Sequence, residues 1–228
     1  MVLTPVVVGA LASGVSWAHL LLTAFWLAGY FAFFATGLWL KSRRKPRYLP
    51  PLKVYLPLAT VLGLGVLAIQ PRIILWAPLF LVPMAVGLVA SATRHERALA
   101  SGLATTVGSS LMTLVAYDLG PGQDWPRAWA LTAVLALYFA GTVLYVKSAI
   151  RERGNRTFLA WSVAYHLTAT LAAALLLDGP ARVALVLIGL ALSARAALVP
   201  DRGWSAARIG VGEIVATVVL AVSALLTL

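Results

Sequence analysis

Apolar residues dominate nine stretches of the chain, and each stretch is bounded by charged residues, proline or glycine. Most are about 20 residues long, the length an α-helix needs to cross the roughly 30 Å hydrocarbon core of a bilayer. We therefore predict an all-α fold, a polytopic integral membrane helical bundle of about nine transmembrane helices, as a single transmembrane domain over residues 1–228. The expected spans are approximately residues 2–14, 17–40, 52–69, 73–92, 98–117, 127–146, 158–177, 182–199 and 208–227.

The first apolar stretch is too short for a full span. As a helix it reaches only about 21 Å, less than the thickness of the hydrocarbon core. It is either a half-helix, or the chain begins at an internal start and lacks the cytoplasmic half of helix 1. We expect the truncated helix 1, because Met1 is followed at once by lipid-type sequence with no polar anchor.

Positive charge alternates from gap to gap along the chain. Of 18 Lys and Arg residues, fifteen lie in or beside four alternate gaps, Lys41–Lys53, Arg94–Arg97, Lys147–Arg156 and Arg195–Arg208. The intervening gaps hold only Arg72, Arg127 and Arg182. Cytoplasmic loops of membrane proteins retain positive charge in this way. The alternation therefore predicts cytoplasmic basic loops, and nine spans then place the C-terminus outside.

Composition supports a membrane location over a soluble basic protein. The chain is 61% apolar and only 11% charged, although its net charge is +11. Because the cations lie at membrane edges, we expect membrane lipid as a partner and no nucleic acid. There is no cysteine, and the three histidines His19, His95 and His166 are far apart in sequence. We therefore expect no metal site and no cofactor.

The two loops before residue 100 carry the first candidate ligand-binding residues. Arginine forks suit phosphate and carboxylate groups, so Arg43, Arg44 and Arg47 form a candidate anion clamp. The alternative is a stop-transfer anchor with prolines that turn the chain. Two further arginines and a histidine in the second loop are the next candidates, with a local salt-bridged turn as the alternative. These residues are Arg94, His95 and Arg97.

The segment from Tyr145 to Arg156 extends the sixth helix into the cytoplasm and supplies further candidates. Lys147, Arg151 and Arg153 are candidate ligand-binding residues. Tyr138, Thr142, Tyr145 and Glu152 lie on one helical stripe, which indicates either a helix-packing surface or a ligand cavity. The candidates for proton handling in any catalysis are Tyr145, Glu152 and His166, although a neutral, hydrogen-bonded histidine is the simpler interpretation of His166.

Glu213 is an acid inside the last predicted span. A buried charge in a membrane needs a partner and indicates function by default. Because Glu213 lies near the basic edge, we expect it to pair with an arginine of a neighbouring helix, namely Arg195.

Several stretches of this chain resemble the YwiC-like family of bacterial membrane proteins. They are Trp26–Phe34, Leu38–Lys45, Tyr48–Pro51, Arg94–Arg97 and Leu144–Asn155, with Tyr165-His166. Members of the family carry a further stretch before Leu3-Thr-Pro5, which agrees with a truncated helix 1. The resemblance implies a multi-pass protein of the bacterial cytoplasmic (inner) membrane.

The layout also resembles, more distantly, the UbiA superfamily of intramembrane prenyltransferases. Those proteins have nine helices and hold Mg²⁺ and a prenyl diphosphate with Asp-rich motifs in the loops after helices 2 and 6. Here no acid precedes Glu96, and the loop after the sixth helix offers Glu152 alone among four cations. Mg²⁺ requires carboxylate oxygens. The resemblance thus implies a UbiA-like layout without the metal-dependent reaction.

Three functions fit these patterns. The first is binding of an anionic amphiphile (an isoprenoid phosphate, a lipid or a carboxylated cofactor) by the Arg and Lys residues of the cytoplasmic loops. The second is a small proton-coupled transporter that uses Glu213 and His166. The third is a non-catalytic membrane subunit that stabilises a protein partner.

Overall fold

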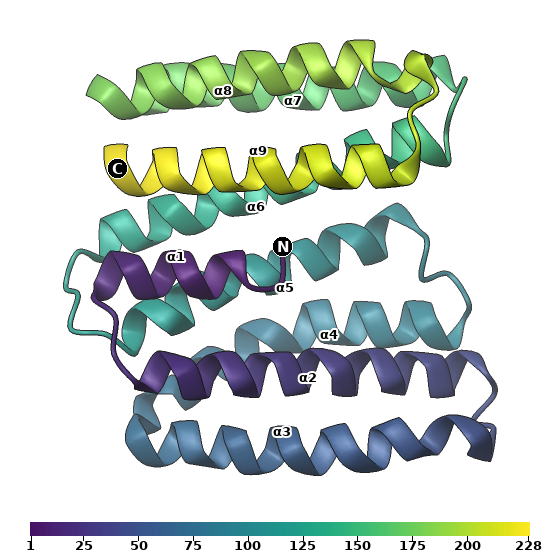
Figure 1. Cartoon of the computed structure of the whole chain (residues 1–228), viewed down its shortest axis with the longest axis vertical. Coiled ribbons are helices and arrows are strands. Elements are labelled where there is room, and N and C mark those ends of the chain that lie inside the picture. Colours follow the sequence, from purple (N-terminus) through teal and green to yellow (C-terminus); the bar gives the residue numbers. More distant parts are fainter. The chain divides into compact units, whose positions relative to one another are not determined.

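The computed structural model describes all residues 1–228 and is helical throughout (Figure 1). Eight helices are long and apolar enough to cross a membrane, and α1 is a short helix of 10 residues. The all-α membrane fold and the short first helix are therefore confirmed, while the truncation of helix 1 stays a prediction. The helices are α1 (Thr4–Ser13), α2 (Ala18–Lys41), α3 (Leu49–Ile69), α4 (Ala77–Ala92), α5 (Leu99–Asp118), α6 (Trp125–Ile150), α7 (Arg156–Leu176), α8 (Gly179–Leu198) and α9 (Ala206–Thr227).

The helices group into two compact units. Unit 1 covers Met1–Thr132, and unit 2 covers Ala133–Leu228. The boundary falls within α6, so unit 1 holds the start of that helix and unit 2 its remainder. A single transmembrane domain over residues 1–228 stays a prediction.

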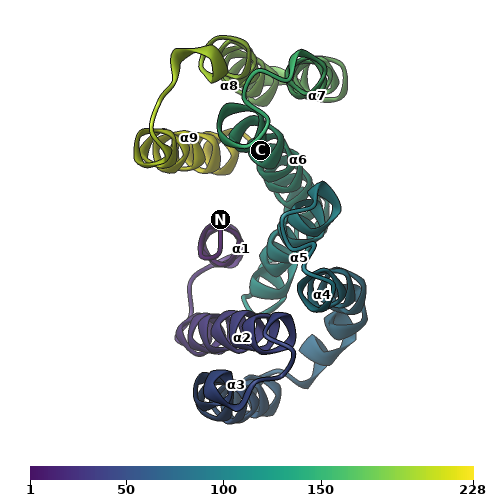
Figure 2. The same ribbon diagram turned by 90° about the vertical axis from the view of Figure 1, so that its right-hand side faces the viewer.

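In unit 1, α2 packs beside both α3 and α4, while α5 packs against α4 and α1 (Figure 2). Small residues permit the closest approach, since a Cβ on Gly9 would lie 2.2 Å from the Thr113 carbonyl oxygen. The buried His19 joins α2 to α5. Its Nε2–H donates to the Ala116 carbonyl oxygen at 2.9 Å, and its Nδ1 accepts from the Ser16 N–H at 2.9 Å. Both ring nitrogens are thus satisfied, so this histidine is structural.

In unit 2, α7 packs beside α8, and α8 packs beside α9. The α6 segment of this unit contacts α7 through the Tyr165 hydroxyl, which donates to the Leu137 carbonyl oxygen at 3.0 Å. Glycine again permits a close approach, because a Cβ on Gly189 of α8 would lie 2.4 Å from the Thr170 hydroxyl oxygen of α7. Close packing over small residues is typical of helix contacts in membranes.

Large apolar side chains are exposed on the helices of both units. Leu20 in α2 is 76% exposed, Leu176 in α7 is 79% exposed and Leu226 in α9 is 80% exposed. Such surfaces are unfavourable in water, because burying a large apolar side chain stabilises a protein by about 1.5–3 kcal/mol relative to leaving it exposed to water. They suit a lipid environment, as the helix lengths do.

Candidate functional site

The basic end of unit 1 is built from the C-termini of α2 and α4. After these helices, Arg43, Arg44 and Arg94 adopt left-handed backbone with φ of 59°, 60° and 62°. The His95 N–H closes the end of α4 by donating to the Ala90 carbonyl oxygen at 2.7 Å. Helix ends of this type usually carry glycine, because a Cβ is disfavoured at such φ values. The sequence therefore holds arginine at three positions where glycine is the ordinary residue.

An ion pair joins the two basic loops of unit 1. Lys41 at the end of α2 donates to the Glu96 carboxylate in the loop before α5. This hydrogen bond holds the pKa of Glu96 below its ordinary value. Glu96 is the sole acid of these two loops. Once it is neutralised by Lys41, the remaining positive charge of the loops is uncompensated.

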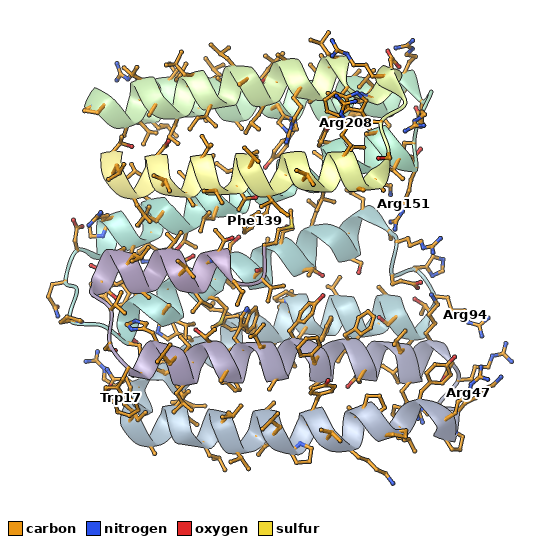
Figure 3. All side chains as sticks on the ribbon, in the orientation of Figure 1. Trp17, Arg47, Arg94, Phe139, Arg151 and Arg208 are labelled. Carbon is orange, nitrogen blue, oxygen red and sulfur yellow. The ribbon has the colours of Figure 1, made fainter.

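Four arginines of these two loops have no acidic partner. All four are exposed, and none takes part in an ion pair. Figure 3 shows Arg47 and Arg94 at the same end of the unit 1 helices. The nearby Arg97 is exposed as well. These four arginines, called the free arginines below because none pairs with an acid, are Arg43, Arg44, Arg47 and Arg94.

An apolar groove ends at the second of these loops. It has a volume of about 370 Å³ and is open along one side. Residues of α4 and the start of α5 form its walls, and His95 lies at its end beside Arg94. The groove is lined by Ala85, Val86, Val89, Ala90, His95, Ala98, Ala100 and Ser101. The arrangement places an apolar surface next to a cationic one, which suits a molecule with an acyl tail and an anionic head.

The basic end of unit 2 is organised differently, because two of its arginines bind groups of another loop, whereas Arg44 and Arg47 of unit 1 lie against the nearby rings of Trp39 and Tyr48. Arg156 pairs with Asp201 at 2.8 Å, and Arg153 donates to the Ala149 and Trp204 carbonyl oxygens at 3.0 and 3.2 Å. The Arg208 guanidinium lies 4.0 Å from the centroid of the Trp204 ring. Arg153 and Arg156 thus link the loop after α6 to the loop after α8.

The other residues predicted at this end, Lys147, Arg151 and Glu152, differ in their contacts. Lys147 lies 5.7 Å from the centroid of the Phe158 ring. Arg151 is exposed, and Figure 3 shows it at the same end of unit 2 as Arg208. Glu152 accepts from the Asn155 side chain at 3.0 Å within the turn after α6. The sequence predicts that the sixth helix extends through this segment, but α6 ends at Ile150 and residues 151–155 form a turn.

A polar cluster lies inside the membrane-length helices of unit 2, centred on Glu213 of α9. The predicted pairing of Glu213 with Arg195 of α8 is confirmed. The second carboxylate oxygen, Oε2, accepts from the Thr142 hydroxyl at 2.8 Å and the Tyr138 hydroxyl at 3.2 Å, both on α6. The Tyr145 ring of α6 lies against the guanidinium, with 4.1 Å from its centroid to Arg195 Cζ. A buried charge pair requires such hydrogen bonds.

His166 of α7 lies beside this cluster. Its Nδ1–H donates to the Ser162 carbonyl oxygen at 2.7 Å, so the ring is held by its own helix. Its Nε2 lies against Gly141, where a Cβ would approach to 3.0 Å. Of the three candidates for proton handling, Tyr145 and His166 are thus brought into one region, and Glu152 is in the turn after α6. A catalytic role for any of them stays a prediction.

Membrane-length apolar helices define a multi-pass integral membrane protein. The chain belongs to the YwiC-like family, whose model, described as YwiC-like protein, matches residues 1–117. The uncharacterized protein YwiC of Bacillus subtilis is 32% identical over 217 residues, which are 94% of this chain and 88% of that protein. An uncharacterized protein of Haemophilus influenzae is 26% identical over 171 residues, 75% of this chain and 72% of that protein.

No solved structure matches the chain. The UbiA-like layout therefore stays a prediction, whereas membership of the YwiC-like family is confirmed.

Proposed function

We propose that this protein binds an anionic amphiphile at the basic end of unit 1. The phosphate or carboxylate head contacts the free arginines Arg43, Arg44 and Arg94, and the apolar tail lies in the groove between α4 and α5. The observation that carries the proposal is the groove that ends at His95 beside Arg94. An acidic loop end or a polar groove would give no such complementarity.

The same proposal includes the orientation of the chain. Bacterial inner membranes present anionic headgroups to juxtamembrane cations, each worth about 1 kcal/mol near the surface. The basic loops are cytoplasmic in this proposal, and the C-terminus is outside. Because Lys41 already neutralises Glu96, the free arginines attract the headgroup without competition from a neighbouring carboxylate.

Lipid binding by the purified protein in mild detergent tests the proposal. Native mass spectrometry should detect phosphatidylglycerol bound in preference to phosphatidylcholine. Replacement Arg94→Gln should weaken phosphatidylglycerol binding about fivefold, which corresponds to the loss of one cation–headgroup contact. The matched control is Arg72→Gln, since Arg72 is an exposed arginine in the short helix before α4, remote in sequence from both basic loops.

A second pair of variants tests the tail site. Ala98→Phe places a ring in the groove and should reduce binding of phosphatidylglycerol, while Ala77→Phe, at the other end of α4, should not. Equal binding of both lipids, or equal loss in Arg72→Gln and Arg94→Gln, would overturn the proposal. The alternatives, a proton-coupled transporter and a non-catalytic subunit, stay predictions.

A further inference from the structure

Helices α4 and α5 of unit 1 are in close contact where Pro83 meets Gly108. A Cβ on Gly108 would lie 3.3 Å from the Pro83 Cβ, so the glycine leaves room for the proline ring. All the residues that line the apolar groove lie on the basic-end side of this contact. On α4 they are within residues 85–90, after Pro83, and around the start of α5 they are within residues 98–101, before Gly108. The contact therefore forms the inner end of the groove, opposite His95.

The basic-end half of α4 is held against α2. The Phe33 ring of α2 fills the space beside Gly87 of α4. One turn further on, a Cβ on Gly37 of α2 would lie 3.0 Å from the Ser91 hydroxyl oxygen of α4. Pro83 also lacks the N–H that would continue the helical hydrogen bonds, and a proline inside a helix bends it at that point. Beyond Pro83 the side of α4 toward α5 is thus left open, which produces the groove.

The contact lies near the middle of both spans. The helical stretch with Pro83 covers Pro71–Ala92 and has 22 residues, and α5, which holds Gly108, has 20. Pro83 precedes the end of α4 at Ala92 by a rise of about 14 Å along the helix. Half of the hydrocarbon core of a bilayer is about 15 Å. The groove therefore reaches from the basic end of the span to about the middle of the bilayer, which is the depth of one leaflet.

The depth of the groove separates two kinds of amphiphile that the basic loops could hold. The acyl chains of a glycerophospholipid end near the middle of the bilayer, because two opposed leaflets make up its core. A polyprenyl phosphate with a longer tail would have to leave the groove before Pro83. Within a membrane, a tail gains from a groove by van der Waals contact along its length and not by leaving water. A groove of one leaflet's depth therefore favours the acyl chain.

We propose that the amphiphile at the basic end of unit 1 is a glycerophospholipid of the adjacent leaflet, with one acyl chain in the groove and its methyl end at the Pro83–Gly108 contact. This position of the tail rests on the proposed function, because the free arginines hold the phosphate. It adds the class of lipid and makes the Pro83–Gly108 contact the limit on the length of the bound tail. The second acyl chain faces the bilayer along the open side of the groove.

Photolabelling of the full chain in phosphatidylcholine vesicles tests the position of the tail. The probe is phosphatidylglycerol with a diazirine on its acyl chain, and phosphatidylcholine with the same diazirine gives the background. A diazirine near the head should label residues 89–101 above this background. A diazirine at the chain end should label Ala85 and Gly108, and neither probe should label residues 77–81 above background. Hexadecyl phosphate should compete about threefold better than a long polyprenyl phosphate.

Two phenylalanine variants of α4 test the inner end of the groove by native mass spectrometry. A side chain at Ala85 tilts toward the start of the helix and hence toward Pro83. Ala85→Phe should weaken binding of dihexadecanoyl phosphatidylglycerol about threefold and leave the dihexanoyl lipid unaffected, since its short chains end nearer the mouth of the groove. The matched control is Val82→Phe, because Val82 is 70% exposed and lies on the other side of the contact. It should change the binding of neither lipid.

The outcomes distinguish this limit on the tail from the proposed function. Labelling of residues 77–81 by the chain-end probe, equal losses in Ala85→Phe and Val82→Phe, or better competition by the polyprenyl phosphate would overturn the position of the tail while leaving the preference for an anionic head intact. A wild type that binds phosphatidylglycerol no better than phosphatidylcholine would overturn the proposed function, and the position of the tail with it.

Discussion

Replacement of Arg94 by glycine should stabilise the fold relative to glutamine and should still weaken lipid binding. Arg94 has a φ of 62°, and the turn is closed by the His95 N–H to the Ala90 carbonyl oxygen at 2.7 Å. Any residue with a Cβ is disfavoured at this φ, whereas glycine is not. Glycine and glutamine both remove the positive charge, so the difference in stability between the two variants reports the effect of the left-handed backbone.

The size of the difference follows from two opposing effects. Relief of the left-handed conformation is worth about 1–2 kcal/mol, and the greater freedom of glycine in the unfolded chain offsets about 0.5–1 kcal/mol of that. Arg94→Gly should therefore be about 0.5–1 kcal/mol more stable than Arg94→Gln, or about 1–3 °C in thermal midpoint for a chain of this size. Both should bind phosphatidylglycerol about fivefold more weakly than the wild type.

Tryptophan fluorescence during heating measures the first quantity, and native mass spectrometry measures the second. Gly154 in unit 2 provides the reverse control. It has a φ of 85° and no atom near its Cβ position, so Gly154→Arg should destabilise through the backbone alone. The reasoning is wrong if Arg94→Gly is no more stable than Arg94→Gln, or if Arg94→Gly keeps the lipid affinity of the wild type.

Three other predictions concern unit stability and topology. The hydrogen bond from Lys41 holds the pKa of Glu96 low. The stability that this pair adds to the fold is therefore present above the ordinary pKa of a glutamate and is lost as pH falls through the lower pKa of the folded state. The thermal midpoints of the wild type and Glu96→Gln should thus differ at about pH 6 and converge in acid. Since the chain has no cysteine, single-cysteine variants report sidedness: an impermeant maleimide should label Gln123→Cys in intact cells and Asn155→Cys only after lysis. Gly9→Ala meets a backbone carbonyl of α5 and should cost about 1–3 kcal/mol in unfolding experiments, whereas Gly29→Ala meets nothing within 4 Å and should not.

Much of the fold could be predicted because the bilayer imposes one length on every span. Apolar runs bounded by charge indicated the helices, although α6 ends at Ile150, before the end of the predicted extension toward Arg156. The pairing of Glu213 with Arg195 was predictable for a similar reason. A carboxylate buried among apolar helices needs a cation, and few cations lie within reach of its depth.

The stripe that joins Tyr138, Thr142 and Tyr145 was visible in the sequence, but its role was not. Helical spacing places these side chains on one face of α6, and it does not say which helix they meet. Contact with Glu213 depends on how α9 packs against α6, 71 residues or more along the chain.

The ion pair of Lys41 with Glu96 and the groove beside His95 were missed for the same reason. The ion pair depends on the packing of α2 beside α4, with partners that are 55 residues apart. The groove depends on how α4 and α5 pack against each other. The left-handed arginines were missed because sequence signals for that conformation are glycine and asparagine. Arginine at such a site carries no local signal.

The two basic ends differ in a way that topology alone does not explain. A loop retained in the cytoplasm needs positive charge nearby, and any position in the loop serves that purpose. In unit 2 the left-handed position after α6 is Gly154, and Arg153 and Arg156 contact protein groups. In unit 1 the left-handed positions after α2 and α4 hold exposed arginines, Arg43, Arg44 and Arg94, where glycine would adopt the same backbone without strain. Strain kept at a position of this kind indicates a requirement for the side chain there, and the anionic headgroup proposed above would supply such a requirement.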